Sequence, residues 1–441
     1  MKKKVLLINL REKKTHPSHP LPPFDLLYLA KHLEENKIET RIIDVILNKR
    51  LEKILAKLSF DIFIIKPQLD NVQAAIRLSK KIKGSSRKRI VILVGPAIKF
   101  FTKKLRKIKQ IDLLAFGEYE FYLTKKLKEY PKKRKIIECS IKKNISNIGG
   151  VKPKKVIGTK YLMFYPSIGI FRKRVGFIMY SRGCPFSCSF CSELHRSSLG
   201  KVVRSRSVND VISEFKNLEK KGINLVYFLD DNILAAPKVR QLLKSLCREK
   251  IKIKFIIQAR PDLINKEIVD LLKKAGCSTV CLGVESFSEF IKDAKRISKK
   301  HIISAVKLLK SANLKLVLFL MVGVPNEKFE DIKEMLEFCK RTSPDMIQIS
   351  FFTLIPGSSI FKKYRRVKIH ATQLVYDKPA NPFFSESYLK RVRRYFYLRY
   401  YTYPSSILKI LKQLPDFIIN IDIYSKLFIS TLKFFMINLL L

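Results

Sequence analysis

The chain lacks any uncharged apolar run of about 18 residues, the length that a membrane-spanning helix needs. Its first residues, MKKKVLLINL, are not followed by the apolar segment and small-residue cleavage site of an export signal, and Pro17 and Pro20 come soon after. Acidic side chains are also scarce, with 37 against 89 basic ones and a formal net charge of +52. We therefore expect neither a membrane span nor an export signal. A cytoplasmic protein is the resulting expectation.

The excess of positive charge restricts the class of partner. A net charge of this size attracts nucleic acid and anionic membrane surfaces. The lysines, however, are spread over every predicted helix and are not gathered into one stripe, which favours a compositional bias. Specific binding of nucleic acid is not expected. A non-catalytic nucleic-acid-binding protein stays open as an alternative that rests on charge alone.

Length and hydrophobic periodicity divide the chain. Its 441 residues, 47% of them hydrophobic, are too many for one ordinary core and indicate two domains. Over residues 1–130, amphipathic helical stretches alternate with five apolar runs: KVLLINL, TRIIDV, DIFIIK, RIVILVG and IDLLAFG. This alternation predicts an α/β fold with a doubly wound, flavodoxin-like parallel sheet. Ligands of such sheets lie at the carboxyl ends of the strands, so the candidate turns follow Leu10, Lys66, Gly95 and Gly117.

The remaining chain has a different pattern. Residues 131–165 contain the stretches PKKRK and VKPKK and predict a basic linker. Six further strand–helix units, from VGFIMYS to MIQISFF, predict a partial (βα)6 TIM-like barrel over residues 166–385. Residues 386–441 become helical and aromatic and predict a helical C-terminal extension. Its last stretch is amphipathic, so we expect it either to pack on the barrel or to lie on a membrane surface.

Eight cysteines are present, and three of them lie within Cys184–Cys191. This clustering is typical of a metal or cluster site in a reducing compartment rather than of a disulfide framework. The strand GFIMYS leads directly into RGCPFSCSFCS, so three thiolates can converge in one loop. Three thiolates bind three irons of a cubane and leave the fourth iron open. The alternative is structural zinc with His195 as fourth ligand, but the end of a barrel strand is where catalytic groups are expected.

The CxxxCxxC motif, with Phe190 before its last cysteine, resembles the signature of the radical S-adenosylmethionine (SAM) superfamily. The form SRGCPFSCSFCS is similar to the subgroup with an N-terminal cobalamin (B12)-binding-type domain. Five motifs at predicted strand ends agree with this: FLDDN, QARPD, LGVES, VGVPNE and LIPGSS. The resemblance implies a cobalamin-binding-like domain over 1–130 and an enzyme that cleaves SAM to a 5′-deoxyadenosyl radical. It assigns a [4Fe–4S] cluster to Cys184, Cys188 and Cys191.

The resemblance also implies roles for other strand-end residues. Asp230 and Asp231 would lie near the methionine part of SAM or near the substrate, and Arg260 would face the same cavity. Glu285 and Ser286 would lie by the ribose or methionyl part of SAM. Local alternatives exist for each of them. An Asp-Asp-Asn sequence at a strand end is also a good helix cap and turn, and Glu285 could form a structural ion pair with Arg260.

Cobalamin is the third cofactor that the resemblance implies. The chain contains no Asp-x-His-x-x-Gly loop that would supply a lower-face histidine, and His16 and His19 have different surroundings. Asp25 stands where the subgroup usually has glycine, and Lys66 stands at a strand end where a small or polar residue is commoner. A domain that only docks or recognises the substrate is the alternative to a cobalamin-binding one.

One rival inside the superfamily is an RNA-modifying methylthiotransferase, which the positive charge would suit. Such enzymes carry three further cysteines in the N-terminal domain, whereas the first cysteine here is Cys139. Their C-terminal RNA-binding β-domain is replaced here by helices. We therefore expect methyl transfer or cyclisation on a small-molecule or lipid substrate. The expected partners are a reductant protein such as ferredoxin or flavodoxin and, through the C-terminal segment, a membrane surface.

Overall fold

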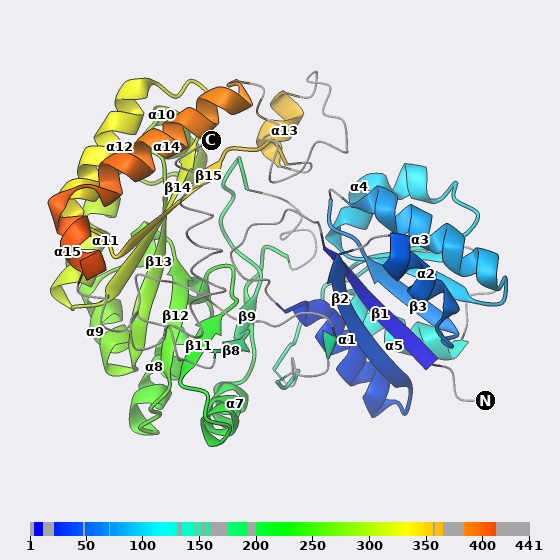
Figure 1. The fold of residues 1–441 in the computed structure, drawn as a ribbon. Coiled ribbons are helices and arrows are strands. Elements are labelled where there is room, and N and C mark those ends of the chain that lie inside the picture. Colours follow the sequence, from blue (N-terminus) through cyan, green and yellow to red (C-terminus); the bar gives the residue numbers. More distant parts are fainter. Residues whose placement is uncertain are drawn as a thin grey trace. The chain divides into compact units, whose positions relative to one another are not determined.

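A computed structural model describes residues 4–11, 22–46, 49–69, 71–129, 135–146, 148–150, 156–157, 175–191, 200–355, 358–364, 381 and 383–411 (Figure 1). The chain divides into two compact units, the first formed mainly by residues up to Tyr161 and the second mainly by residues from Leu162 on. Both are built on parallel sheets, so the α/β class predicted from the sequence is confirmed.

The first unit is a parallel sheet of seven strands in the order β6-β5-β4-β3-β1-β2-β7. The order β2-β1-β3-β4-β5 within it is that of a flavodoxin-like doubly wound sheet, as predicted. Helix α1 packs beside α5 and α2 beside α3, and the two pairs cover opposite faces (Figure 1). The strands are β1 (Lys4–Arg11), β2 (Glu39–Ile46), β3 (Ile62–Lys66), β4 (Ile90–Val94), β5 (Leu113–Gly117), β6 (Lys135–Cys139) and β7 (Val156–Ile157). The helices are α1 (Phe24–Glu35), α2 (Lys49–Lys57), α3 (Val72–Ser85), α4 (Pro96–Leu105) and α5 (Tyr119–Glu129).

The segment over 131–165, where the sequence predicts a basic linker, adds two strands to this sheet. β6 pairs in parallel with β5, and β7 pairs in parallel with β2. Both are short edge strands: β6 has the partly polar sequence KIIEC, and β7 has only two residues, Val156 and Ile157. Their apolar signal is therefore too weak to stand out among the lysines of the sequence, and the sheet supplies the pairing that propensity alone does not.

The second unit contains an open parallel sheet of six strands in the order β15-β14-β13-β12-β11-β8. Consecutive strands are neighbours, with at least one helix between each pair, which is the predicted partial (βα)6 barrel. The strands are β8 (Val175–Ile178), β11 (Leu225–Phe228), β12 (Lys254–Ala259), β13 (Cys277–Glu285), β14 (Lys315–Val322) and β15 (Met346–Phe351). The helices are α7 (Val208–Lys220), α8 (Val239–Arg248), α9 (Lys266–Lys274), α10 (Glu289–Lys295), α11 (Lys299–Ser311) and α12 (Phe329–Thr342).

Short elements connect these units of the barrel. They are the antiparallel pair β9 (Ser181–Arg182) and β10 (Arg204–Ser205), the 3₁₀ turns η3 (Ile233–Ala235) and η4 (Pro261–Leu263), and α13 (Ser359–Lys363). Several barrel helices begin at polar caps whose side chains accept a hydrogen bond from the first turn: Ser207, Asn265, Ser288 and Ser298. Each such cap contributes about 1 kcal/mol to the stability of its helix. The caps therefore favour a helix that starts directly after each of these residues.

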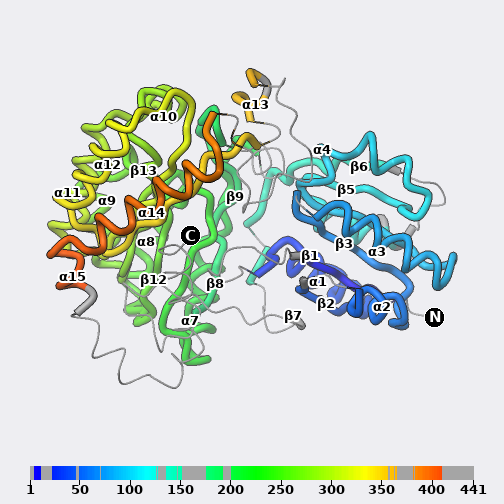
Figure 2. The backbone as a smooth tube through the Cα atoms, turned by 45° about the horizontal axis from the view of Figure 1, so that its top comes forward, coloured from blue at the N-terminus to red at the C-terminus, as the bar shows by residue number. Residues whose placement is uncertain are grey.

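The C-terminal extension begins with α14 (Glu386–Tyr401) and α15 (Pro404–Leu411). Figure 2 shows α14 lying along the outside of the barrel. The Tyr400 hydroxyl donates to the carbonyl of Pro344 over 2.6 Å, and the Tyr397 hydroxyl accepts from the Ile349 amide over 3.1 Å. The predicted helical tail is thus confirmed up to Leu411, and residues 412–441 lie outside the described part. No helix in the described ranges is both long and apolar enough to cross a membrane.

Candidate functional site

The carboxyl ends of the six barrel strands lie at one edge of the second sheet, because all of the strands are parallel. This is the edge at which barrels of this kind place their reactive groups. The residues expected from the sequence follow the first four strands in this order: the cysteine loop after β8 and β9, Asp230 and Asp231 after β11, Arg260 after β12, and Glu285 and Ser286 at the end of β13.

Asp230 holds the start of the cysteine loop. Its side chain is buried, with 2% exposure, and it accepts hydrogen bonds from the Tyr180 amide at 3.0 Å and from the Ser181 amide and hydroxyl at 2.5 Å. Burial raises the pKa of Asp230 to about 6, although the hydrogen bonds from Ser181 and Tyr180 lower it. Asp231, by contrast, is exposed at the same strand end. Asp230 is therefore buried among donors of the protein, whereas Asp231 lies at the surface of the site.

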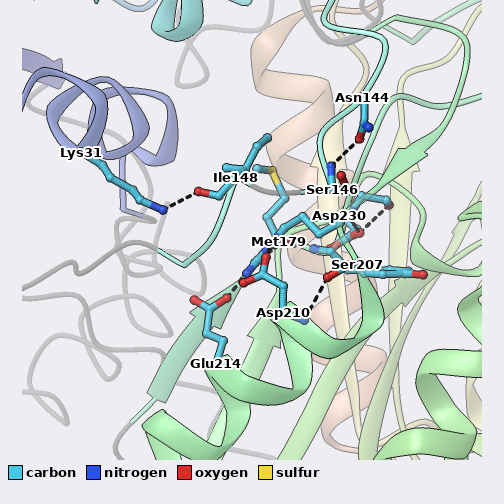
Figure 3. A network of polar contacts seen from close by, with 12 residues as sticks. Lys31, Asn144, Ser146, Ile148, Met179, Ser207, Asp210, Glu214 and Asp230 are labelled. Carbon is cyan, nitrogen blue, oxygen red and sulfur yellow. Dashed lines mark hydrogen bonds and ion pairs between the residues drawn. The ribbon is translucent and has the colours of Figure 1, made fainter. Parts of the chain in front are cut away.

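A buried arginine, Arg206, also holds the segment that leads into the cysteine loop. Arg206 donates from its backbone to the Tyr180 carbonyl at 2.8 Å and from its side chain to the Met179 carbonyl at 3.0 Å. The carboxylates of Asp210 and Glu214 on α7 lie 2.8 and 2.7 Å from its guanidinium (Figure 3). No sequence motif pointed to Arg206, because nothing in its local sequence separates it from the many other basic side chains.

The cysteine loop is half-buried and packs on the barrel at its second cysteine. Cys184, Cys188 and Cys191 all have intermediate exposure, and the Cys191 amide donates to the Cys188 carbonyl at 3.1 Å. The guanidinium of Arg260 donates to the Cys188 sulfur at 3.0 Å. Burial raises the pKa of Cys184 above its ordinary value, although the hydrogen bond from the Phe186 backbone and the charge of Arg260 partly oppose it.

The other described cysteines differ from this loop. Four of them are buried in the two cores: Cys139, Cys277, Cys281 and Cys339. Burial raises the pKa of Cys139 and of Cys277 to about 12, so these thiols stay protonated and unreactive near neutral pH. In the described part of the chain, the cysteine loop after β8 is therefore the segment that contains several partly exposed cysteines close together in sequence.

The donor set of this loop fits an iron–sulfur cluster. Thiolates are soft ligands suited to iron–sulfur clusters and zinc, and a neighbouring guanidinium suits their negative charge. Within the described residues, no three His, Cys, Asp or Glu side chains are placed to hold a single metal ion. Thiolates of a cubane bind different irons, so they need not be as close as ligands of one ion. His195, the fourth ligand of the zinc alternative, lies outside the described residues.

Glu285 has an unusual backbone. Its φ is +69°, and the pairing of β13 with β14 shifts register between Gly283 and Glu285. Such irregularities re-aim side chains at strand ends. The Glu285 carboxylate pairs with Lys295 Nζ at 2.9 Å, so the alternative ion pair with Arg260 is replaced by one with Lys295. Lys295 is 6% exposed and lies at the end of α10, and no sequence motif pointed to it.

Ser286 is hydrogen-bonded to a second buried residue, Glu327, to which the sequence assigned no role. The Ser286 hydroxyl donates to Glu327 Oε1 at 2.8 Å, and Glu327 Oε2 accepts from the Gly323 amide at 2.5 Å. Burial raises the pKa of Glu327 to about 7, while the hydrogen bonds from Gly323 and Ser286 lower it. Glu327 ends the motif VGVPNE after β14, which could have identified it. It holds the ends of β13 and β14 together.

A small cavity adjoins this end of β13. Its volume is about 20 Å³, and its lining includes Ser286, Phe287, Lys295 and Ile302. This is room for about one water molecule, far less than a nucleoside needs.

The corresponding edge of the first sheet carries three interacting polar side chains. Lys66, at the end of β3, lies 2.7 Å from Asp25 Oδ1 on α1, and the Tyr119 hydroxyl donates to Asp25 Oδ2 at 2.6 Å. Desolvation raises the pKa of Asp25, but Lys66, Tyr119 and the Leu26 amide together lower it below its ordinary value. A Cβ on Gly95 would lie 3.2 Å from Lys66 Cγ. Two turns expected from the sequence, after Lys66 and after Gly95, thus meet at this edge.

Comparison with known proteins agrees with the geometry. The family model described as "Radical SAM superfamily" matches residues 178–339, from the end of β8 into α12. An uncharacterized methyltransferase, PH0819, of Pyrococcus horikoshii is 29% identical over 365 residues, which are 77% of this chain and 78% of that protein. The hopanoid C-3 methylase of Methylococcus capsulatus is 28% identical over 188 residues, 41% of this chain and 35% of the methylase.

A solved structure extends the likeness of fold beyond the matched domain. The methyltransferase TsrM from Kitasatospora setae, determined with cobalamin and a [4Fe–4S] cluster bound, superposes with a TM-score of 0.62 and 16% sequence identity. The superposition covers 82% of this chain and 74% of TsrM. The fold is therefore shared over both sheets, while an identity this low carries no information on ligands.

Proposed function

Because the chain belongs to the radical SAM superfamily, we propose that it is a methyltransferase of that superfamily acting on a small-molecule or lipid acceptor. The observation that carries the proposal is the cysteine loop at the carboxyl end of β8, with Cys188 beside a guanidinium inside the matched domain. Cys184, Cys188 and Cys191 would hold a [4Fe–4S] cluster. Methyl transfer is favoured over cyclisation because an uncharacterized methyltransferase matches this chain over 77% of its length.

Residues around the cysteine loop would hold the loop in place and contact SAM. When bound, the cluster supplies the electron for the cleavage of SAM. Asp230 fixes the entry to the loop through Tyr180 and Ser181. The Glu285 carboxylate, turned by its positive φ, is the candidate acceptor for SAM hydroxyls, and exposed Asp231 is a further candidate contact.

Only the fold of the first sheet supports the binding of cobalamin. The switch point of the first sheet, between β1 and β3, is where such a sheet takes a ligand. The described residues at that edge, Lys66, Asp25 and Tyr119, are bonded to one another, and none of them is a histidine that could bind cobalt. These contacts do not fit a corrin by themselves, so no step of the reaction is assigned to cobalamin.

The membrane proposal has one support in the described part of the tail. Four apolar side chains at the end of α14, in the turn that follows it and on α15 are exposed: Leu398 (37%), Tyr403 (39%), Ile407 (41%) and Leu408 (57%). We call them the α15 patch. Lys340 lies 5.6 Å from the centre of the Tyr403 ring. Apolar side chains among cations are typical of proteins that bind anionic membrane surfaces, which would suit a lipid acceptor.

The decisive experiment is anaerobic reconstitution with iron and sulfide, followed by incubation with SAM, a reductant such as reduced flavodoxin, and cobalamin. We expect about four irons per chain and cleavage of SAM, with a methylated product once an acceptor is supplied. Methylated product that forms equally without cobalamin would remove cobalamin from the proposal. Wild-type protein that takes up no iron–sulfur cluster would overturn the whole proposal.

A further inference from the structure

Among the described residues, the Arg260 side chain donates four hydrogen bonds at the candidate site. It is 8% exposed, and its Nε and Nη2 donate to the two carboxylate oxygens of Asp262 at 3.0 and 3.1 Å. Nη2 also donates to the Lys295 carbonyl at 3.0 Å. Because a guanidinium is planar, this two-point contact with Asp262 fixes its orientation. The remaining terminal nitrogen, Nη1, is then aimed at the Cys188 sulfur, 3.0 Å away.

The flat face of the same guanidinium holds the cysteine loop at a second point. Its central carbon lies 3.8 Å from the centre of the Phe186 ring, which is two residues before Cys188. A cation at this distance is attracted by the negative charge on the face of the aromatic ring. One side chain thus contacts both an aromatic ring and a sulfur of the loop.

The last turn of α10 completes the arrangement. The carbonyl of Ala294 accepts from the Ser189 amide at 3.1 Å, and the next carbonyl, that of Lys295, accepts from Arg260. The Lys295 side chain in turn pairs with Glu285 at 2.9 Å. Cys188, Arg260, Lys295 and Glu285 are therefore linked in series from the cysteine loop to the end of β13.

A permanent cation at a cluster sulfur has a chemical consequence. A guanidinium stays protonated at all ordinary pH values and can only donate. Hydrogen bonds to the sulfurs of an iron–sulfur cluster are among the factors that set its reduction potential. Since reduction adds a negative charge to the cluster, a buried cation that donates to one of its thiolates favours the reduced form and raises the potential.

We propose that Arg260 is a positioning residue that orders the cysteine loop through Phe186 and Cys188 and raises the reduction potential of the cluster. This inference rests on the proposed function, because it presumes a cluster on Cys188. It differs from the role that resemblance implies, a residue facing the SAM cavity, since each of its hydrogen bonds above goes to the protein. Asp262 then has a defined part as well: it orients Arg260 and partly neutralises its charge.

The test is a redox titration of the reconstituted cluster without SAM, monitored by electron paramagnetic resonance. Arg260→Gln removes the charge, Arg260→Lys keeps it without the planar fork, and Asp262→Asn keeps the guanidinium but removes its counter-charge. Arg240→Gln is the matched control, because Arg240 forms an exposed ion pair with Glu267 at 2.9 Å, away from the loop. Iron and sulfide per chain are measured for every variant, so that the potential refers to loaded protein.

At a fixed applied potential, we expect at least a tenfold lower ratio of reduced to oxidised cluster in Arg260→Gln, equivalent to about 59 mV for one electron. Arg260→Lys should recover part of the loss, Asp262→Asn should shift the ratio upward, and Arg240→Gln should match wild type. Equal reduction potentials in wild type and Arg260→Gln would overturn the inference. If Arg260→Gln binds no cluster, a reduction potential in Asp262→Asn equal to that of wild type would overturn it instead. A wild type that binds no cluster would instead refute the proposed function.

Discussion

Lys66 Nζ lies 2.7 Å from Asp25 Oδ1, at the carboxyl edge of the first sheet. In the sequence these are two separate departures from the pattern of the resembling subgroup, 41 residues apart. In the fold they are one feature, because each charge neutralises the other and Tyr119 donates to the same carboxylate. A charged residue at either position alone would be poorly solvated at this partly buried edge, which explains why both are present.

We expect Lys66→Met to lower the free energy of unfolding by about 1–3 kcal/mol at pH 7, because it leaves the Asp25 carboxylate without its cation. The double variant Lys66→Met/Asp25→Asn should be less destabilised, since no charge is left unpaired. Urea unfolding of the anaerobically purified apoprotein measures both. Lys4→Met is the control, because Lys4 pairs with Glu39 at 3.6 Å with both side chains about half exposed, and should change stability little.

The same pair predicts a pH dependence. The folded-state pKa of Asp25 is below its ordinary value of 3.8, so the pair contributes fully above that value. Its contribution is lost as the pH falls from there through the lower folded-state pKa. Between pH 7 and pH 3, wild type should therefore lose more stability than the double variant. Parallel curves for the two proteins would show that the pair does not stabilise the fold.

Cys184→Ala, Cys188→Ala and Cys191→Ala should each abolish the cluster and the cleavage of SAM, because each removes one of three thiolates in a single loop. Cys247→Ala, Cys277→Ala and Cys339→Ala should retain both. Iron content and 5′-deoxyadenosine formation after reconstitution are the measurements. His195→Ala should behave as wild type, whereas purified protein that holds zinc, and loses it in this variant, would establish the structural-zinc alternative.

Asp230 and Asp231 should respond differently to loss of charge. Asp230→Asn leaves an amide facing amide donors from Tyr180 and Ser181, so we expect a loss of about 1–3 kcal/mol in unfolding free energy and poorer iron retention. Asp231→Asn, at an exposed position, should keep the stability and iron content of wild type and raise only the KM for SAM or substrate. Equal effects of the two changes on stability would contradict the structural role of Asp230.

The α15 patch predicts binding to anionic vesicles. Ile407→Glu/Leu408→Glu should reduce co-sedimentation with phosphatidylglycerol vesicles several-fold, because it removes exposed apolar contact and adds negative charge. Ile303→Glu, at another exposed apolar position (52%), is the control and should bind as wild type does. Binding of tRNA should be weak, fall steeply with salt and be the same in all three proteins. A salt-resistant complex with particular tRNAs would favour RNA modification instead.

The sequence by itself determined the order of the elements and the position of the cysteine loop. Apolar runs such as IVILV in β4 are buried throughout, and burial is what hydrophobic periodicity reports. The cysteine spacing is equally local, because one loop carries all three residues of the motif. Each of Asp230, Arg260 and Glu285 directly follows or ends an apolar run, so the local sequence also suffices to place them at the ends of strands.

The tertiary structure alone decided which of these side chains meet. The partners of Arg260 are Cys188, 72 residues away, and the Lys295 carbonyl, and Glu285 pairs with Lys295 rather than with Arg260. It also decided that Lys66 and Asp25 form one pair and that β6 and β7 join the first sheet. Contacts of this kind depend on strand order and register, which bring distant residues within a few ångströms and which no local pattern of residues encodes.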